Sequence, residues 1–143
     1  MFIYKRTAQY HETDQMAIVH HSNYIKWMEE ARIAFLKEIG LPYAEMERDG
    51  ITSPVVEINV NYKDMVRFDD QVEICVRLVS YNGVTLGISY EMKNEATGKL
   101  CTTATSKHCF LKGGRIVSPK KCRQELDEVL KAALEEGKNT TNE

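Results

Sequence analysis

The sequence predicts one α+β domain in which an antiparallel sheet of five to six strands wraps around one long central helix, with a C-terminal helix after it. Two observations carry this prediction: a helical pattern of apolar residues early in the chain, and alternating apolar and polar residues in the segments that follow. A length of 143 residues fits a single domain. We therefore treat residues 1–143 as one domain and expect a flexible tail over about residues 138–143.

The long helix is expected to follow a short N-terminal strand, residues 2–10, and to run from Ser22 to Ile39. The Ser22 hydroxyl can accept a hydrogen bond from a free amide of the first turn, which predicts that Ser22 is the N-cap. Gly40 supplies a left-handed residue at the other end, and Pro42 confirms that the helix has ended. Both boundaries of the helix are thus predicted.

Apolar residues cover an unusually broad part of this helix. With successive residues about 100° apart, the apolar positions span roughly 200° of its surface, whereas a typical surface helix has a stripe of about 100°. These positions are Tyr24, Ile25, Trp27, Met28, Ala31, Ala34, Phe35, Leu36 and Ile39. Such a helix should be largely covered by other elements.

Alternation with a period of two predicts the strands of the sheet. The strand segments are residues 56–62, 72–78, 84–92, 99–111 and 115–117. Ser118 as a cap and Pro119 in the first turn then predict the C-terminal helix. An antiparallel sheet curled around one helix is the hotdog architecture, and an uncovered edge strand of it can pair with a second copy of the chain.

Composition and charge argue against several classes of protein. The net charge is −2, from 19 basic and 21 acidic residues without a cluster of either sign, so we expect no nucleic-acid partner. No apolar run approaches the roughly 18 residues that span a bilayer. The N-terminus resembles no targeting peptide, so we expect no stable membrane insertion and a cytoplasmic location. The four cysteines form no C-x-x-C pair, which favours buried free thiols over a zinc finger or disulfide framework.

Residues 10–24, YHETDQMAIVHHSNY, concentrate chemically active side chains directly before the long helix. The N-terminus of a helix presents unpaired amides and a partial positive charge, which can hold an oxygen that becomes negative during a reaction. Asp14 beside this terminus could attack a carbonyl group, or activate water to attack it. The alternative interpretation is a loop aspartate that hydrogen-bonds its own backbone.

Three histidines lie in this stretch, but their spacing does not indicate a metal site. His20 and His21 are adjacent and point in different directions on either a strand or a helix, and no H-E-x-x-H motif includes His11. We therefore expect neither a metal nor a cofactor. No G-x-S-x-G motif supports a serine nucleophile, which leaves Ser22 as a cap. The side chains of His20 and His21 are interpreted either as loop residues or as part of a site.

The run from Glu12 to Tyr24 resembles the signature of the hotdog acyl-CoA thioesterases, the 4-hydroxybenzoyl-CoA thioesterase family with its YbgC-like bacterial members. That signature has an Asp, two small residues, a Gly, two aliphatic residues, an aromatic, and then His, Tyr or Phe at the start of the helix. Further positions that resemble the family are Pro54-Val55-Val56, Tyr62, Asp70 and Glu29-Glu30-Ala31-Arg32. The resemblance therefore covers nearly the whole chain.

The resemblance implies hydrolysis of an acyl-CoA thioester to a carboxylic acid and CoA. Asp14 matches the family's catalytic carboxylate, which acts as a nucleophile or as a general base on water. The backbone N–H of His21 matches the donor that polarises the thioester carbonyl, and the neighbouring His20 and Tyr24 are expected to contact the substrate. The resemblance also implies a homodimer or homotetramer with the site between two subunits and CoA along the interface.

Two features depart from the family pattern. Ala17 stands where the family usually has glycine, which puts a methyl group and a stricter backbone where the thioester passes, so we expect Ala17 to affect substrate binding. The basic cluster that binds the CoA nucleotide in some members is replaced by Ser80-Tyr81-Asn82-Gly83. On charge alone, the candidates for binding the CoA phosphates are Lys63, Arg67, Lys112 and Arg115, although each is also an ordinary surface charge.

Two alternative functions stay open in the sequence. A hotdog hydratase resembles this chain only in architecture, and it usually has an Asp five residues before its catalytic His. Here Asp14 lies six residues before His20 and seven before His21, so that pattern fails. A non-catalytic protein that binds acyl thioesters would be consistent with Ala17 and with the missing basic cluster. The acyl group itself is not indicated by the sequence.

Overall fold

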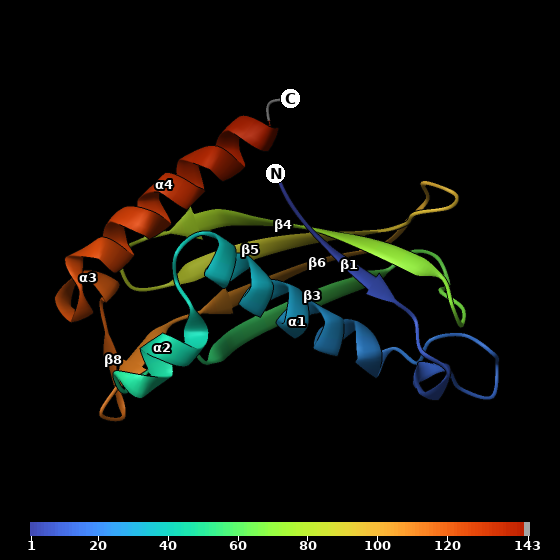
Figure 1. Ribbon diagram of the computed structural model, residues 1–143, viewed down its shortest axis with the longest axis horizontal. Helices are drawn as coiled ribbons and strands as arrows, with labels where there is room; N and C mark the ends of the chain where they lie inside the picture. Colours follow the sequence, from blue (N-terminus) through green and yellow to red (C-terminus); the bar gives the residue numbers. More distant parts are fainter. Residues whose placement is uncertain (142–143) are drawn as a thin grey trace.

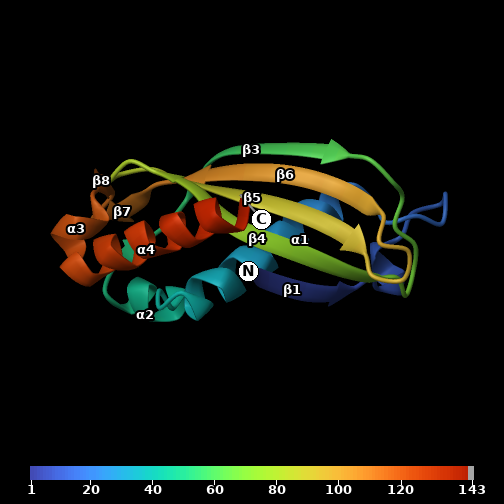
Figure 2. The same cartoon turned by 90° about the horizontal axis from the view of Figure 1, so that it is seen from above.

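The computed structural model describes residues 1–141 and confirms the α+β architecture (Figure 1, Figure 2). Its large antiparallel sheet has the order β1-β4-β5-β6-β3, and a small sheet has the order β2-β7-β8. The strands of the large sheet are β1 (Phe2–Thr7), β3 (Val55–Tyr62), β4 (Gln71–Tyr81), β5 (Leu86–Asn94) and β6 (Leu100–His108). The strands of the small sheet are β2 (Ile51–Thr52), β7 (Phe110–Lys112) and β8 (Arg115–Val117).

Two predicted strands differ from those observed. The segment 99–111 was expected as one strand, but it divides at Cys109 between the large and the small sheet. The N-terminal strand ends at Thr7 rather than at residue 10, because the Ala8 N–H donates to the Asp70 carbonyl at 2.9 Å. A short 3-10 helix, η1 (Tyr10–Glu12), follows.

The long helix α1 (Ser22–Glu38) lies along one face of the large sheet, and its predicted boundaries are confirmed to within one residue (Figure 1). Gly40 has the left-handed φ of +98° expected after a helix. The N-cap is His21, so the prediction for Ser22 is wrong. The Ser22 hydroxyl instead bonds to Nδ1 of His20 at 2.8 Å. Pro42 is the N-cap of a short helix that the sequence did not reveal, α2 (Tyr43–Arg48).

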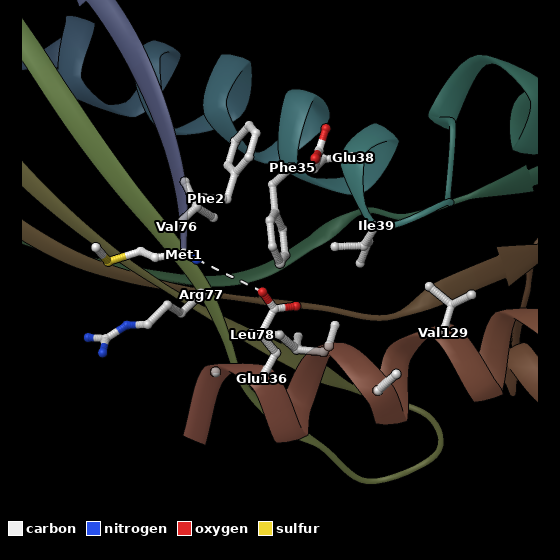
Figure 3. A pocket seen from close by; sticks show the side chains of 13 residues that line it. Met1, Phe2, Phe35, Glu38, Ile39, Val76, Arg77, Leu78, Val129 and Glu136 are labelled. Atoms are coloured by element: carbon white, nitrogen blue, oxygen red, sulfur yellow. Dashed lines mark ion pairs between the residues drawn. The ribbon is translucent and has the colours of Figure 1, made fainter. Parts of the chain in front are cut away.

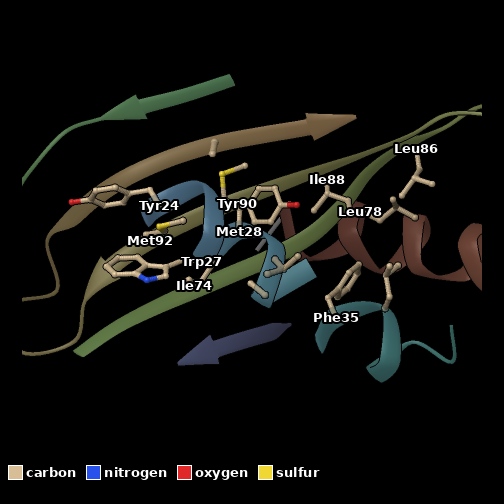
Figure 4. Packing of buried hydrophobic residues seen from close by; sticks show 14 of the residues in the cluster. Tyr24, Trp27, Met28, Phe35, Ile74, Leu78, Leu86, Ile88, Tyr90 and Met92 are labelled. Atoms are coloured by element: carbon tan, nitrogen blue, oxygen red, sulfur yellow. The ribbon is translucent and has the colours of Figure 1, made fainter. Parts of the chain in front are cut away.

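The broad apolar face of α1 packs against the middle of the large sheet (Figure 4). Fully buried side chains from the helix, such as Trp27, meet others from the strands, such as Ile74 and Tyr90. Each large apolar side chain buried in this way contributes about 1.5–3 kcal/mol. The α1 residues predicted to be covered and found buried are Tyr24, Trp27, Met28, Ala31, Phe35 and Leu36. Ile25 is exposed, so the helix is covered over a narrower arc than predicted.

Strand β3 was expected to be half-buried, and within a single chain it is not. Val56, Ile58 and Tyr62 are 60%, 38% and 49% exposed. The reason is its position: β3 is an edge strand that pairs only with β6. The α1 side chains reach the central strands, but the α1 backbone approaches β1 and β4, on the side of the sheet away from β3 (Figure 2). An edge strand with exposed apolar side chains can bind another protein chain, both through its unpaired backbone groups and through its apolar surface.

The C-terminal helix is interrupted. Ser118 caps α3 (Pro119–Cys122), as predicted, by accepting from the Lys121 N–H, and α4 (Gln124–Thr141) begins after an extended residue, Arg123. Helix α4 packs against β4 so closely that a Cβ atom on Gly137 would lie 2.3 Å from the Leu78 carbonyl oxygen. The segment expected as a tail, residues 138–143, is thus helical as far as Thr141, and residues 142–143 lie outside the described part.

All four cysteines are free, with Cys101 and Cys109 buried. Among the described residues, no helix is both long and apolar enough to cross a membrane.

Candidate active site

The residues before α1 form a small hairpin that presents Asp14. Thr13 and Val19 pair as an antiparallel bridge, and the Asp14 N–H donates to the Ile18 carbonyl at 2.9 Å. The Ala17 N–H donates to the Asp14 carbonyl at 3.0 Å, and Ala17 has a φ of +62°. A turn followed by one left-handed residue is a common three-residue hairpin loop, in which glycine is the usual choice for that residue. Ala17 therefore adopts a conformation that favours glycine, at the position where the sequence resemblance led us to expect glycine.

Replacing Ala17 by glycine should therefore stabilise the protein by up to about 1.5 kcal/mol. The substitution relieves a left-handed alanine, which costs roughly 1–2 kcal/mol, but it adds about 0.4–1 kcal/mol of chain entropy to the unfolded state. Urea unfolding measures the difference. The matched control is Gly98→Ala, which puts a methyl group at a φ of +72° with no atom within 4 Å and should destabilise. Destabilisation by Ala17→Gly would mean that the Ala17 methyl group makes a packing contact that its exposure does not reveal.

The Asp14 carboxylate is half-buried, and only one of its two oxygens is hydrogen-bonded. Its Oδ1 atom accepts from the Met16 N–H at 2.8 Å, so the interpretation of Asp14 as a loop aspartate is realised for that oxygen. The second oxygen, Oδ2, has no hydrogen-bond partner within residues 1–141. One oxygen orients the carboxylate, and the other is available for chemistry.

His21 contributes a free backbone donor at the N-terminus of α1. Its own N–H has no hydrogen-bond acceptor in the described part of the chain. The next N–H, that of Ser22, is taken by Nδ1 of His20 at 3.2 Å. The His21 carbonyl accepts from the Tyr62 hydroxyl at 3.0 Å, which fixes the start of the helix to β3. The free amide therefore sits at the positive end of the helix in a held position.

Asp14 and His21 line one pocket of about 340 Å³ beside the helix start. The other residues of its wall are Met16, Ile18, Val19, Tyr24, Tyr62, Lys63, Asp64 and Met65. The Tyr24 and Tyr62 rings meet edge to face at 5.2 Å. Burial raises the pKa of Tyr24 to about 12, so its hydroxyl stays neutral at physiological pH. The pocket thus combines an apolar wall with two carboxylates, a cation and His21, the residue whose backbone amide is free.

The structure brings together in this pocket only some of the site residues that were predicted from the sequence. Asp14, His21, Tyr24 and Lys63 share the pocket, whereas His20, Ala17 and Arg67 are not among the residues that line it. The His20 ring instead lies against the His21 ring, 4.1 Å between centroids, and its Nδ1 atom is occupied by Ser22. Lys112 and Arg115 flank the β7–β8 turn, at the other end of the molecule from the hairpin (Figure 2).

Three further residues matter to the site and were not predicted as part of it. Tyr62 holds the helix start, Asp64 lines the pocket, and Glu12 hydrogen-bonds to both α1 and the loop. Tyr62 was identified as a strand residue and as one of the positions that resemble the family, but without a role in the site. Glu12 lies three residues after Gln9, and the two form a capping box around η1, which is a readable signal for a turn but not for its tertiary partners.

A second pocket, of about 370 Å³, lies near the C-terminal end of α1 (Figure 3). Phe35 of α1, Ile39 directly after it, Leu78 of β4 and Val129 of α4 place apolar side chains in its wall. Two glutamates also line it, Glu38 and Glu136, and Glu136 lies 3.9 Å from the chain's N-terminal ammonium. It holds no histidine or cysteine and no free amide at a helix start, so it offers less chemistry than the pocket at Asp14. Within residues 1–141, no group of His, Cys, Asp and Glu side chains is arranged to hold a metal ion.

The pocket at Asp14 suits acyl transfer. A carboxylate with one free oxygen can attack a carbonyl carbon or take a proton from water. An unpaired amide at the positive end of a helix stabilises negative charge on the carbonyl oxygen. A carboxylate that attacks and an amide that polarises are the two groups that hydrolysis of an activated ester requires.

Comparisons with known proteins agree with this chemistry. Residues 8–134 match the thioesterase-like superfamily. The chain is 42% identical over 101 residues to YneP of Bacillus subtilis, which is provisionally named an acyl-CoA thioesterase, and the match covers 71% of this chain and 72% of that protein. The structure is similar to DHNA-CoA thioesterase from Staphylococcus aureus, with a TM-score of 0.90 and 29% identity over 99% of this chain and 94% of that one. It is also similar to a hypothetical protein from Aquifex aeolicus, with a TM-score of 0.84 and 38% identity over 91% and 99% of the two chains.

Proposed function

Because the chain belongs to the thioesterase-like superfamily, we propose that it hydrolyses acyl-CoA thioesters, with Asp14 and the backbone N–H of His21 as the reacting groups. Membership makes the chain an enzyme of thioester hydrolysis, and its hotdog fold is that of its structural relatives. The acyl-CoA form of the substrate is supported by the names of YneP and of the S. aureus thioesterase. The observation that carries the proposal is that Asp14 and His21 line the same pocket.

In the proposed reaction, the thioester carbonyl oxygen accepts a hydrogen bond from the His21 N–H. Negative charge that develops on this oxygen is stabilised by the partial positive charge of the helix N-terminus. Asp14 then acts in one of two ways. It attacks the carbonyl carbon and expels the CoA thiolate, leaving an anhydride that water opens, or it takes a proton from a water molecule that attacks. In both routes the carbon–sulfur bond breaks, one water molecule is consumed, and the thiolate takes up a proton and leaves as a thiol.

The acyl group and CoA would occupy different parts of the pocket. Met16, Ile18 and Tyr24 offer an apolar wall suited to an acyl chain or an aromatic acyl group. Lys63 brings an exposed ammonium to the same pocket and is our first candidate for a CoA phosphate. Arg67 stays a weaker candidate because it does not line the pocket.

We further propose that two chains associate through β3, as a dimer or as part of a tetramer, with the pocket at their interface. Support comes from the exposed apolar face of this edge strand and from Tyr62, a β3 residue that contacts His21. Light scattering should give at least a dimer for the wild type. Ile58→Lys should shift the protein toward monomers, whereas Ile116→Lys, at a more exposed isoleucine on β8, should not. A monomeric wild type at assay concentration would contradict the association.

A screen over short, long and aromatic acyl-CoAs tests the proposed function. The loss of thioester absorbance should be followed beside thiol release, because partly exposed Cys75 and Cys122 can react with thiol reagents. We expect hydrolysis of at least one acyl class. Binding of CoA esters without turnover would instead support a non-catalytic acyl-thioester-binding protein, and addition of water to a 2-enoyl-CoA would support a hydratase. A cytoplasmic location is part of the proposal, and the free thiols agree with a reducing compartment.

A further inference from the structure

Glu12 is a buried carboxylate directly before the Asp14 hairpin, and it does not line the pocket. Only 4% of the residue is exposed. Its side chain accepts from the Gln9 N–H at 2.8 Å, from the indole N–H of Trp27 at 2.8 Å, and from both terminal nitrogens of Arg6, at 3.2 and 3.0 Å. One carboxylate thus ties β1, η1 and α1 together.

The backbone of Glu12 reaches the other end of the loop. Its carbonyl oxygen accepts from the His20 N–H at 2.8 Å and from the side-chain amide of Asn23 at 2.9 Å. Asn23 is buried in the first turn of α1. The segment that carries Asp14 therefore begins and ends on contacts of a single residue, and His21 follows directly after the second contact.

The chemistry of this contact set requires a carboxylate. Every group that faces the side chain is a hydrogen-bond donor, and an ionised carboxylate is acceptor-only. The Arg6 guanidinium forms an ion pair with Glu12. It also lies over the Trp27 ring, 5.7 Å from the ring centroid, in a cation–π contact that helps to hold it there. A glutamine of the same shape would turn an N–H₂ group toward at least one of these donors and leave it unpaired.

We propose that Glu12 is a positioning residue of the active site, which holds the Asp14 carboxylate and the His21 amide at the spacing that thioester hydrolysis needs. The proposal rests on the proposed function of the same pocket. Reacting groups must lie within a fraction of an ångström of their productive geometry, and a displacement of about 1 Å can lower the rate by roughly 10²-fold. Glu12 acts on the rate through the loop, without touching the substrate.

The test is Glu12→Gln, assayed for kcat and KM on the best acyl-CoA of the screen. We expect kcat to fall by roughly 10- to 100-fold, with KM changed by less than about threefold, because the residues of the pocket wall remain. The matched control is Glu30→Gln, which removes the other carboxylate partner of Arg6, 2.9 Å from its Nε atom, without touching the loop. Its kcat should stay close to that of the wild type.

In a variant that is verified to be folded, Trp27 supplies a direct readout of the Glu12 contact. It is the only tryptophan in the chain, and its indole N–H donates to Glu12. The emission of folded Glu12→Gln should differ from that of the wild type, whereas Glu30→Gln and Asp14→Asn should keep the wild-type emission. If Glu12→Gln does not fold, Glu12→Asp replaces it: the charge is kept, the oxygens retreat by one methylene group, and an intermediate kcat at unchanged KM is expected.

Wild-type kcat and unchanged Trp27 emission in a folded Glu12 variant would overturn the proposal. So would a loss of kcat in Glu30→Gln as large as that in Glu12→Gln, because the effect would then belong to Arg6. Failure of the proposed function is distinguishable, since the wild type itself would hydrolyse no acyl-CoA. In that case, amide exchange across residues 13–21 decides the loop-holding role: faster exchange in Glu12→Gln than in Glu30→Gln supports it, and equal exchange refutes it.

Discussion

Asp14→Asn should lower the hydrolysis of acyl-CoA by about 10²- to 10⁴-fold. The asparagine carbonyl oxygen can still accept from the Met16 N–H, so the hairpin should keep its shape. What disappears is the negative charge on the free oxygen, and with it both the nucleophile and the general base. The measurement is kcat/KM on the best substrate of the screen, with circular dichroism and light scattering to verify the fold and the association.

Asp64→Asn is the matched control for this experiment. Asp64 lines the same pocket and also accepts a neighbouring N–H, that of Met65 at 2.9 Å. Asp64→Asn removes one negative charge from the pocket but leaves the Asp14 carboxylate in place. We therefore expect kcat/KM to change by less than about tenfold. Near wild-type turnover by Asp14→Asn, or equal losses in the two variants, would remove Asp14 from the mechanism.

Acid should destabilise the protein through His108, by about 3 kcal/mol between pH 6.5 and pH 4. His108 is 1% exposed, and burial, together with the nearby Arg32 guanidinium, lowers its pKa from 6.5 to about 4, partly offset by the Pro54 carbonyl. Its Nε2 atom bonds to the Ser106 hydroxyl at 2.7 Å, and that hydroxyl also bonds to Tyr90. Protonation would therefore place a second cation beside Arg32 in the interior.

The direction follows from proton binding. Between pH 6.5 and about 4 the unfolded chain binds a proton at His108 and the folded chain does not, so the free energy of unfolding falls as the pH falls. A pKa difference of one unit corresponds to about 1.4 kcal/mol, so a fall of the His108 pKa from 6.5 to about 4 corresponds to a loss of about 3 kcal/mol in the free energy of unfolding. Urea unfolding at a series of pH values measures it.

His108→Gln isolates this effect from the titration of carboxylates. Glutamine stays neutral over the whole range, so the free energy of unfolding should depend less steeply on pH in the variant than in the wild type. The comparison concerns the slope, so a constant loss of stability in the variant does not disturb it. Identical slopes would show that His108 contributes nothing to acid sensitivity.

Local patterns predicted the secondary structure well wherever a local cause was sufficient. The boundaries of α1 follow from its apolar periodicity and from Gly40, whose left-handed φ needs only its own backbone. Ser118 caps α3 as predicted, because the hydrogen bond from the Lys121 N–H to the Ser118 hydroxyl joins residues only three positions apart. Ser22 failed as a cap because a neighbour, His20, competes for its hydroxyl and for its amide, and that competition depends on the conformation of the preceding loop.

The candidate site was predictable in part. The resemblance singled out Asp14 and His21 by position, and both line one pocket. It gave no role to Glu12, the first residue of the resembling run, whose partners Arg6 and Trp27 lie 6 and 15 residues away. Nor did it indicate that Tyr62, 41 residues from His21 in the chain, would hold the helix start. Such contacts join strands and helices whose approach is set by packing of the whole core.

The sequence by itself determined the fold class, the long buried helix and the position of the Asp14 loop, because periodicity, turn residues and a motif are local properties. Only the tertiary structure decided which face of β3 is uncovered, how far α4 extends along β4, and which carboxylate is buried under the loop. These depend on which segments meet, since an edge strand and an interior strand can carry the same alternation. Ala17 illustrates both kinds of information. Its position in the motif is a property of the sequence, whereas its left-handed backbone appears only in the folded hairpin.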